Sequence, residues 1–262
     1  MRIVGCVFLV AAVASVGACA KRDEPSWAKL PDHGTSGDST ITGEPAKVVH
    51  FATAPTIDGK LDDAVWNDAT VLGPLVDPGG GKEDRASRVA SYGKLGWDDK
   101  NLYVGMVVRD DSPVSPFKRD DADPHLWEKS SAIELMIQPG DPGDNKDYYE
   151  IQMDTKNAIF DTHWDDYNTP IVDGEVFGHP LWSCKAERAA TIDGGRSYTI
   201  EAAIPFSAFE KGRVSFPPKS GDVWRINLYS FRDGQSIALA WSPIKGQGNF
   251  HRSSRFGRVK FQ

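Results

Sequence analysis

The sequence predicts an all-β fold, a jelly-roll-like antiparallel β-sandwich with one or two short helices. Three observations support this prediction: apolar and polar residues alternate with period two over many short runs, turn-forming residues separate the runs, and helical periodicity is scarce. The 262 residues are 40% hydrophobic and 26% charged, which is ordinary for a folded globular chain. Many short strands with regular turns are typical of a sandwich.

The alternating runs predict strands at 101–108, 131–138, 148–154, 198–205, 224–231, 238–243 and 257–261. Within each run every second side chain is apolar, so one face of the strand is expected to point into the core. The inward-facing residues are Leu102, Val104, Met106 and Val108; Ile133, Leu135 and Ile137; Ile151 and Met153; Tyr198, Ile200, Ala202 and Ile204; Trp224, Ile226 and Leu228.

Turns and helices complete the pattern. Clusters of Gly, Pro and Asp separate the runs at 139–143, 193–195 and 233–234. Helical spacing of apolar residues occurs at 61–69 and 205–211, and each segment predicts one short helix. We find no internal repeat.

The first 18 residues have the pattern of a secretory signal peptide. Arg2 precedes an apolar run over residues 3–18, which is too short to span a bilayer and ends in small residues. The sequence VGAC at 16–19 resembles the bacterial lipobox, and this resemblance implies that Cys19 becomes the lipid-anchored first residue of the mature chain. An ordinary signal peptide cut nearby, with Cys19 incidental, is the alternative.

Residues 19–46 are polar and rich in Gly, Pro, Ser, Thr and Asp, a composition that cannot build a core and predicts a flexible tether. The folded domain is expected to occupy residues 47–262. The lipobox resemblance also implies a location, namely export to the bacterial cell envelope with attachment to the membrane through the N-terminal lipid. Ala20, in place of Asp at that position, favours the outer membrane.

The net charge argues against a nucleic-acid partner, and the cysteine content excludes an internal disulfide. The formal net charge of −7 leaves no electrostatic footprint for phosphate backbones, so nucleic acid is not an expected partner. Loss of Cys6 with the signal and acylation of Cys19 would leave Cys184 as the single thiol, which excludes an internal disulfide. Cys184 is predicted to be a small buried hydrophobe, since no Cys-His signature surrounds it.

Seven sequence motifs occur in order along the expected domain. They are PTIDGKLDDAVW (55–66), GWDDKNLYV (96–104), AIEL (132–135), YEIQ (149–152), EAAIP (201–205), WRINLY (224–229) and FHR with RFG (250–252 and 255–257). Together they resemble the family 9 carbohydrate-binding modules and their sugar- and haem-binding β-sandwich relatives. The resemblance covers nearly all of residues 48–262 and implies carbohydrate binding, which would support polysaccharide capture or catabolism at the envelope. A structural or adhesive envelope lipoprotein without a sugar ligand is the alternative.

Two of the eight Trp residues are candidates for stacking on a sugar. Trp127 and Trp164 lie among charged residues in segments that read as loops, whereas Trp66, Trp97, Trp224 and Trp241 follow apolar stripes and are expected in the core. The family resemblance implies that two aromatic residues clamp a terminal sugar, a role we assign to Trp127 and Trp164. The alternative is that each Trp fills the end of the sandwich.

Polar candidates surround this pair. Glu150 and Gln152 share one strand face and could hydrogen-bond adjacent sugar hydroxyls, or the face could simply be exposed to solvent. His251 and Arg255 belong to the C-terminal motif of the family and are candidate sugar ligands by resemblance. A salt bridge from Arg255 to Glu134 or another carboxylate would explain that residue without a ligand.

Other chemistry is less well supported by the sequence. Family resemblance and the Asp-rich segments at 110–111, 120–123 and 161–166 leave structural calcium open, but the spacing identifies no ligand set. No catalytic motif is present, although the many carboxylates leave hydrolysis of O-glycosyl bonds as an open alternative. Haem would need axial ligands, and Met106, Met136 and Met153 lie in strand runs where core packing is the commoner role.

The anchor gives a direct prediction. The wild-type chain, expressed in a bacterial host, is expected to partition into the detergent phase, because several acyl chains at one residue anchor a protein stably. Cys19→Ser should release the protein or block its processing, as measured by phase partitioning and immunoblotting. Equal partitioning of the two forms would contradict acylation.

Overall fold

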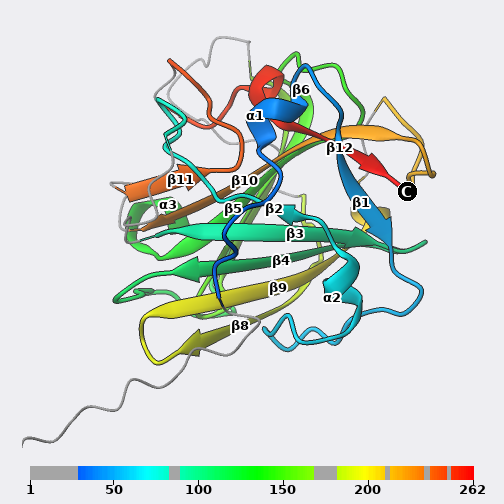
Figure 1. Cartoon of the computed structure of the whole chain (residues 1–262). Helices are drawn as coiled ribbons and strands as arrows, with labels where there is room; N and C mark the ends of the chain where they lie inside the picture. Colours follow the sequence, from blue (N-terminus) through cyan, green and yellow to red (C-terminus); the bar gives the residue numbers. More distant parts are fainter. Residues whose placement is uncertain (1–28, 83–88, 168–181, 210–212, 233–236, 247–248) are drawn as a thin grey trace, which may run out of the picture.

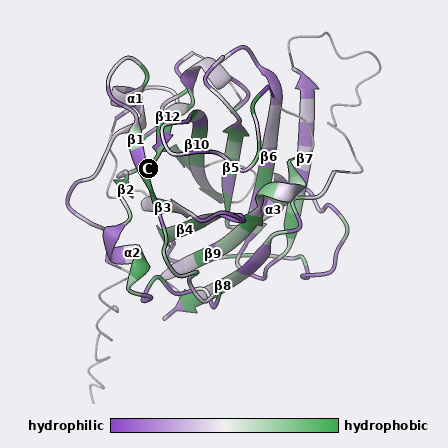
Figure 2. Cartoon of the chain, turned by 90° about the vertical axis from the view of Figure 1, so that its right-hand side faces the viewer, coloured by the Kyte–Doolittle hydropathy of each residue, from purple (hydrophilic) through white to green (hydrophobic). Residues whose placement is uncertain are grey.

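The computed structural model describes residues 29–82, 89–167, 182–209, 213–232, 237–246 and 249–262. They form two facing β-layers (Figures 1 and 2), as expected for a sandwich. One layer contains β1 (Ala46–His50), β2 (Val71–Leu72), β3 (Ser91–Trp97), β4 (Asn101–Arg109), β8 (Glu187–Asp193) and β9 (Ser197–Pro205). The other contains β5 (Ala132–Gln138), β6 (Lys146–Asp154), β7 (Ile159–Asp166), β10 (Val223–Arg232), β11 (Ile237–Ala240) and β12 (Gly257–Phe261).

Helices are few and short, in agreement with the sequence. The segment 61–69 contains α2 (Val65–Asp68), and the segment 205–211 contains a single 3-10 turn, η2 (Phe206–Ala208). The remaining helical elements among the described residues are α1 (Gly37–Thr40), α3 (Leu126–Lys129) and η3 (Ser253–Arg255). In the described part of the chain, no helix has the length and apolar character needed to cross a bilayer.

The two layers are joined along one edge through β1. The strand order is β7-β6-β5-β10-β12-β1-β3-β4-β9-β8, and β1 pairs in parallel with both β12 and β3. The sheet is therefore mixed and not wholly antiparallel. Parallel pairing needs long connections, and the many residues between β1 and either partner supply them. A Cβ atom on Gly96 would lie 2.1 Å from the ring of Phe51, so only glycine fits where the chain after β1 crosses β3.

The core between the layers consists of the side chains that the period-two alternation places inward. All the inward-facing residues predicted from the sequence have 1% or less of their surface exposed. The four Trp residues assigned to the core, Trp66, Trp97, Trp224 and Trp241, are 0–5% exposed. Cys184 is a buried free thiol, and burial raises its pKa well above the ordinary value. These predictions are confirmed.

Glu201 joins two of the motifs recognised in the sequence. Its side chain lies on the outer face of β9 and is completely buried. One carboxylate oxygen accepts a hydrogen bond from Trp66 Nε1 at 2.8 Å, and the other accepts from the backbone N–H groups of Asp58 and Gly59 at 3.1 and 3.2 Å. The Ile-Asp-Gly turn and α2 are thereby fixed to the sheet.

The N-terminal segment differs from the tether predicted over 19–46. Residues from Leu30 onward lie against the sandwich, Thr35 bridges to Leu72, and α1 packs on β12. The composition of this segment is too polar to form a core of its own, but hydrogen bonds to backbone groups of the domain hold it in place. The folded unit therefore begins before residue 47.

Replacing Glu201 tests the importance of this junction. Glu201→Ala leaves a buried indole N–H and two backbone N–H groups without an acceptor, so we expect the free energy of unfolding to fall by about 2–4 kcal/mol. Glu187→Ala, at an exposed position of the neighbouring strand β8, should change it by less than about 0.5 kcal/mol. Urea unfolding measures both, and equal effects would contradict the structural role of Glu201.

Candidate functional site

The candidate site lies on the outer face of the layer that contains β5, β6, β7 and β10. Antiparallel register places Glu134 opposite Gln152 and Glu150 opposite Thr162, with all four side chains on this face. Each is at most 5% exposed, because α3 and the segment before β12 cover the face through Leu126, Phe250 and Phe256. Simple solvent exposure of Glu150 and Gln152, the alternative left open by the sequence, is therefore wrong.

A buried hydrogen-bonded chain connects three of these residues to Trp164. The amide Nε2 of Gln152 donates to Glu134 Oε2 at 3.0 Å and to Glu150 Oε1 at 2.8 Å. Trp164 Nε1 donates to Glu150 Oε2 at 3.0 Å. The Gln152 amide thus bridges the two carboxyl groups, and the indole N–H of Trp164 donates to the second oxygen of Glu150.

Two polar atoms on this face have no hydrogen-bond partner in the part of the chain that the structure describes. They are Gln152 Oε1 and Thr162 Oγ1, and both are buried. Buried polar groups are ordinarily paired with protein or water, so each of these two atoms is a position at which a ligand or a water molecule could supply the missing hydrogen bond.

The two carboxyl groups hold protons more tightly than ordinary glutamates do. Burial raises the pKa of Glu150 from 4.5 to about 7, although hydrogen bonds from Trp164 and Gln152 oppose the shift. Burial, together with the neighbouring charge of Glu150, raises the pKa of Glu134 well above its ordinary value. His251 Nε2 lies 3.9 Å from Glu150 Oε2, but burial lowers its pKa to about 3, so the imidazole is neutral. The pair therefore keeps a proton near neutral pH.

Aromatic rings cluster around Trp164. Its ring lies parallel to that of Tyr148 with centroids 6.2 Å apart, and edge-on to Tyr167 at 5.2 Å and to His251 at 4.9 Å. Tyr167 stacks on His251 at 4.1 Å. The loop predicted around Trp164 is wrong, because residues 159–166 form β7. The flanking Asp161 and Asp165 point to the opposite face of that strand, which is why a charged stretch can contain a buried Trp.

Trp127 lies at the far end of the same face. It belongs to α3, stacks on His125 with centroids 4.3 Å apart, and contacts Phe160 edge-on at 4.8 Å. Phe160 and Trp164 are four residues apart on β7, a distance of about 13 Å along the strand. Trp127 and Trp164 therefore flank the buried polar chain at its two ends, and no ring contact among the described residues joins them.

His251 reaches the site from the segment that precedes β12. Tyr148 Oη and His251 Nδ1 are 2.7 Å apart, and Asn145 Nδ2 donates to the carbonyl of His251 at 3.1 Å. Asn249 Nδ2 donates to Tyr167 Oη at 3.0 Å. We refer to residues 249–255 as the rim segment. The structure thus brings together four of the candidate site residues, Trp164, Glu150, Gln152 and His251.

Arg255 is the predicted site residue that lies apart from this group. Its guanidinium forms a salt bridge with Asp38 in α1, and its Nε donates to the carbonyl of Pro243 at 3.1 Å. The sequence left open a salt bridge with a carboxylate, and the partner found is Asp38 and not Glu134.

Sequence reasoning missed several residues of the site. Glu134 and Tyr148 could have been found, because the same alternation that selects Glu150 places them on its face. Tyr167 and Asn249 carry no comparable signal, since each lies outside a regular strand and reaches the site only through folding.

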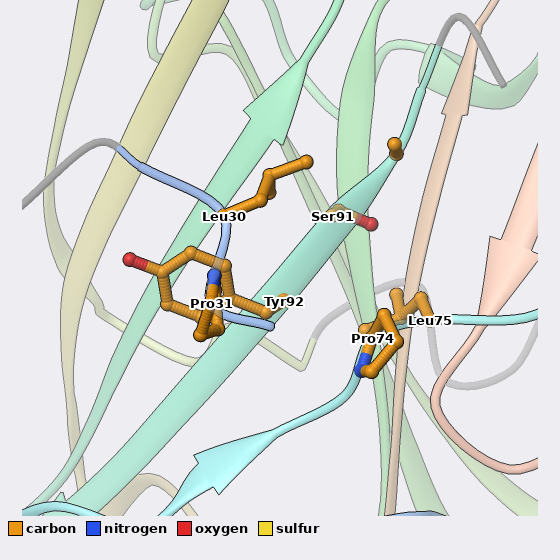
Figure 3. Close-up of a pocket in the computed structure, with 7 residues that line it drawn as sticks. Leu30, Pro31, Pro74, Leu75, Ser91 and Tyr92 are labelled. Carbon is orange, nitrogen blue, oxygen red and sulfur yellow. The ribbon is translucent and has the colours of Figure 1, made fainter. Parts of the chain in front are cut away.

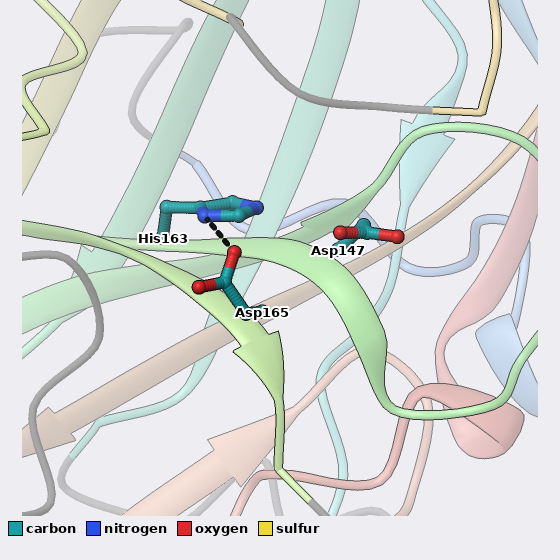
Figure 4. A group of neighbouring side chains, drawn as sticks. All are labelled: Asp147, His163 and Asp165. Atoms are coloured by element: carbon teal, nitrogen blue, oxygen red, sulfur yellow. Dashed lines mark ion pairs between the residues drawn. The ribbon is translucent and has the colours of Figure 1, made fainter.

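A separate group of metal-ligating side chains lies at the edge of β6 and β7 (Figure 4). One ligand atom from each of Asp147, His163 and Asp165 lies within 4.8 Å of the others. His163 Nδ1 is 3.3 Å from Asp165 Oδ1, and Asp147 Oδ2 is 3.5 Å from Arg213 Nε. The cationic guanidinium beside Asp147 already balances part of the negative charge, so the group has a protein partner without a metal.

Carboxylates from two of the Asp-rich segments that the sequence offered for calcium have partners within the protein. Asp110 and Asp111 both pair with Arg232, at 3.0 and 2.9 Å. Asp161 accepts a hydrogen bond from the backbone N–H of Cys184, and Asp166 pairs with Lys146. Among the described residues, Asp147, His163 and Asp165 are the one group in which three metal-ligating side chains meet, and segments 110–111 and 120–123 contribute no residue to it.

The small pocket in Figure 3 lies elsewhere, where the N-terminal segment rests on β3. Its walls are mostly apolar and its volume is about 10 Å³, close to the smallest cavity that holds one water molecule. This pocket cannot accept a sugar ring. Its lining includes Leu30, Pro31, Pro74, Leu75, Ser91 and Tyr92.

Comparison with known proteins assigns the fold to a family. Residues 57–262 match the family model described as carbohydrate family 9 binding domain-like. The chain belongs to this family. Among curated protein sequences, the comparison found no match to this chain.

Solved structures agree with this assignment at the level of the fold. Two are family 9 carbohydrate-binding modules from Caldicellulosiruptor kristjanssonii. The one in complex with cellotriose is 18% identical, with a TM-score of 0.57 and coverage of 83% of this chain and 93% of the module. The one in complex with glucose is 17% identical, with a TM-score of 0.54 and coverage of 82% and 95%. A third, from Bacteroides uniformis ATCC 8492, for which carbohydrate binding has been suggested, is 18% identical, with a TM-score of 0.61 and coverage of 82% and 98%.

The buried carboxyl pair makes the stability of the family 9 domain depend on pH. The folded-state pKa of Glu150 is about 7 and its ordinary value is 4.5, so the folded state binds more protons than the unfolded state between these values. Stability should therefore be greatest below pH 4.5, as far as this residue contributes, and decline as the pH rises through 7.

Glu134→Gln isolates this contribution. It removes one charge from the pair and keeps an oxygen that can accept from Gln152, so the decline between pH 5 and 8 should become shallower than in the wild type. Glu201, whose pKa is also raised to about 7, contributes equally to both proteins and cancels in the comparison. Urea unfolding at several pH values measures the slopes, and parallel slopes would show that the two carboxyl groups are not coupled.

Proposed function

We propose that this chain binds carbohydrate on the outer face of β5, β6 and β7. The observation that carries the proposal is the buried chain Glu134–Gln152–Glu150–Trp164, with unpartnered polar atoms beside it, on a domain of the carbohydrate family 9 binding type. Aromatic rings flank the chain at both ends.

The chemistry of the face suits a sugar. A pyranose has hydroxyl groups around its edge and a weakly positive C–H face, which pairs with the electron-rich face of an aromatic ring. Trp127, Tyr167 and His251 are partly exposed rings at the margin of the face. Below them, Glu150 and Gln152 offer acceptor oxygens to hydroxyl donors.

The ligands of the solved modules suggest the first compounds to test. Cellotriose and glucose are bound in the Caldicellulosiruptor structures. Both are neutral and rich in hydroxyl donors, which is the chemistry that the acceptors of this site complement. We therefore propose neutral gluco-oligosaccharides as the starting ligand class.

The cellular setting is a second part of the proposal. The signal-like N-terminus and the lipobox resemblance at 16–19 support export and lipid anchoring through Cys19, a residue outside the described part of the chain. A lipid-anchored carbohydrate-binding domain would retain oligo- or polysaccharide at the bacterial envelope, in support of its capture or catabolism. The outer membrane is the expected location.

Removal of either flanking Trp tests the binding face. Trp164→Ala and Trp127→Ala should each weaken binding of cello-oligosaccharides about tenfold or more, since stacking and the contacts that depend on it together exceed 1.4 kcal/mol. Isothermal titration calorimetry measures the affinity. Circular dichroism monitors the fold, which matters for Trp164 because its side chain is only 8% exposed.

Phe216→Ala is the matched control. Phe216 is a partly buried ring that packs on Trp224 and Phe209 in the core cluster between the layers, separate from the cluster that contains Trp164 and Trp127, so its loss should lower stability without changing affinity. Folded Trp variants that bind as the wild type does would show that the site is elsewhere. Absence of glycan binding by the wild type would leave a structural or adhesive lipoprotein in its place.

A further inference from the structure

Residues 35–40, which we call the N-terminal strap, precede the part of the chain that matches the family. The strap is hydrogen-bonded to both layers at Thr35. Its backbone N–H donates to Val71 at 2.8 Å, and its carbonyl accepts from Gly73 N–H at 3.0 Å and from Trp241 Nε1 at 2.6 Å. One residue of the strap thus connects the β2 region with the segment after β11.

The strap also fits closely against that second segment. Gly37 N–H donates to the carbonyl of Trp241 at 3.2 Å, and a Cβ atom on Gly37 would lie 2.7 Å from Ser242 Cβ. Thr40 Oγ1 accepts from the backbone N–H of Arg258 in β12 at 2.8 Å. There is no space for a side chain at Gly37, so the strap and residues 241–242 are in direct contact.

An ionic contact leads from the strap to the rim segment. Asp38 pairs with Arg255 and, at 2.8 Å, with Lys245. Burial alone would raise the pKa of Asp38, but hydrogen bonds and charge from Lys245 and Arg255 outweigh it and hold that pKa below its ordinary value. The Asp38 carboxylate is therefore ionised and attached to the C-terminal end of η3.

The middle of the rim segment is held by Asn145. Its backbone N–H donates to Ser253 Oγ at 2.7 Å, its side-chain oxygen accepts from Ser253 N–H at 2.6 Å, and its Nδ2 donates to the carbonyl of His251. The rim segment is thus fixed at Ser253 by Asn145 and at Arg255 by Asp38. His251, which contacts Trp164 and Tyr167, lies directly before these two attachments.

A second route connects the strap to the rim through buried groups. Asn227 accepts from Ser242 N–H at 2.8 Å and donates to Ser242 O at 2.9 Å and Tyr229 Oη at 2.7 Å. Tyr229 stacks on Phe250 with ring centroids 4.0 Å apart and an interplanar angle of 10°. The strap contacts Ser242, and a continuous series of contacts then runs from Ser242 through Asn227 and Tyr229 to Phe250, the residue before His251.

We propose that the N-terminal strap is part of the binding site, with Asp38 as a positioning residue that acts through Arg255 to hold His251 against Trp164. This inference rests on the proposed function and extends it to residues outside the family match. It also gives Arg255 a role, since that residue positions the rim and does not contact the ligand.

The pKa of the His251 imidazole provides a readout that does not depend on the global stability of the domain. Tyr148, Trp164, Tyr167 and Glu150 surround it, and burial lowers its pKa to about 3. Release of the rim segment would expose the imidazole to water and move its pKa upward, toward the ordinary value of 6.5. NMR of 15N-labelled imidazole, assigned with His251→Asn, follows this titration in the full chain.

Asp38→Ala in the full chain is the principal test. We expect the pKa of His251 to rise by at least one unit and the affinity for cellotriose to fall about fivefold or more, a usual size for coupling between two sites. Arg255 is 18% and Asp38 40% exposed, so the pair adds little to global stability and the variant should stay folded. Gly37→Ala perturbs the strap independently and should act in the same direction.

Lys245→Asn is the matched control. It removes the other cation that pairs with Asp38 and leaves Arg255 intact. Asparagine tolerates the positive φ of 55° that Lys245 has at this position. Its His251 titration and its affinity should equal those of the wild type. The inference is overturned if Asp38→Ala and Gly37→Ala titrate as the wild type does. If the wild type binds no sugar, the proposed function fails, and the His251 titration still decides whether the strap holds the rim.

Discussion

Burial of both faces of β5, β6 and β10 is the constraint on which the rest of the structure depends. Their inner face packs into the core between the layers, and their outer face is covered by α3, the segment after β11 and the rim. Polar groups on a covered face need partners within the protein, because desolvation without a partner is costly. Glu134, Gln152, Glu150 and Trp164 supply one another with donors and acceptors, and the strands that carry them can therefore stay buried. A site for a hydroxyl-rich ligand and a stable covered face both need hydrogen-bond donors and acceptors placed close to one another.

The sequence predicts the inner face of each strand well and the outer face poorly. Alternation alone identifies Ile133, Leu135 and Ile137 as core, since only the local pattern matters. Whether Glu150 is exposed or buried depends on what covers it, and the covering residue His251 is about a hundred positions away in the chain. The wrong loop prediction around Trp164 has the same cause, namely that a local pattern does not show what packs against a residue. Its charged neighbours suggest a loop, but in a strand they point to the opposite face, and no local pattern distinguishes the two cases.

Domain boundaries drawn from composition or from family similarity both begin too late here. Composition measures apolar content, and the strap contributes little of it. Its attachment depends on backbone hydrogen bonds at Thr35, on the absence of a side chain at Gly37 and on one carboxylate at Asp38. None of these leaves a hydrophobic signal in the sequence. The family match begins at residue 57, within the Ile-Asp-Gly turn that Glu201 fixes, and therefore leaves out both β1 and the strap.

Attachment of Leu30 and Pro31 to the domain surface also limits how far the domain can move from a membrane. With Cys19 acylated as proposed, residues 20–29 separate the lipid from Leu30. Ten residues span at most about 35 Å when fully extended. A domain held at this distance meets ligand in a thin layer beside the bilayer, where tethering sets the effective concentration of binding sites. Even a weak single-site affinity for each sugar would then retain a long polysaccharide, because one chain could contact many neighbouring copies of the protein.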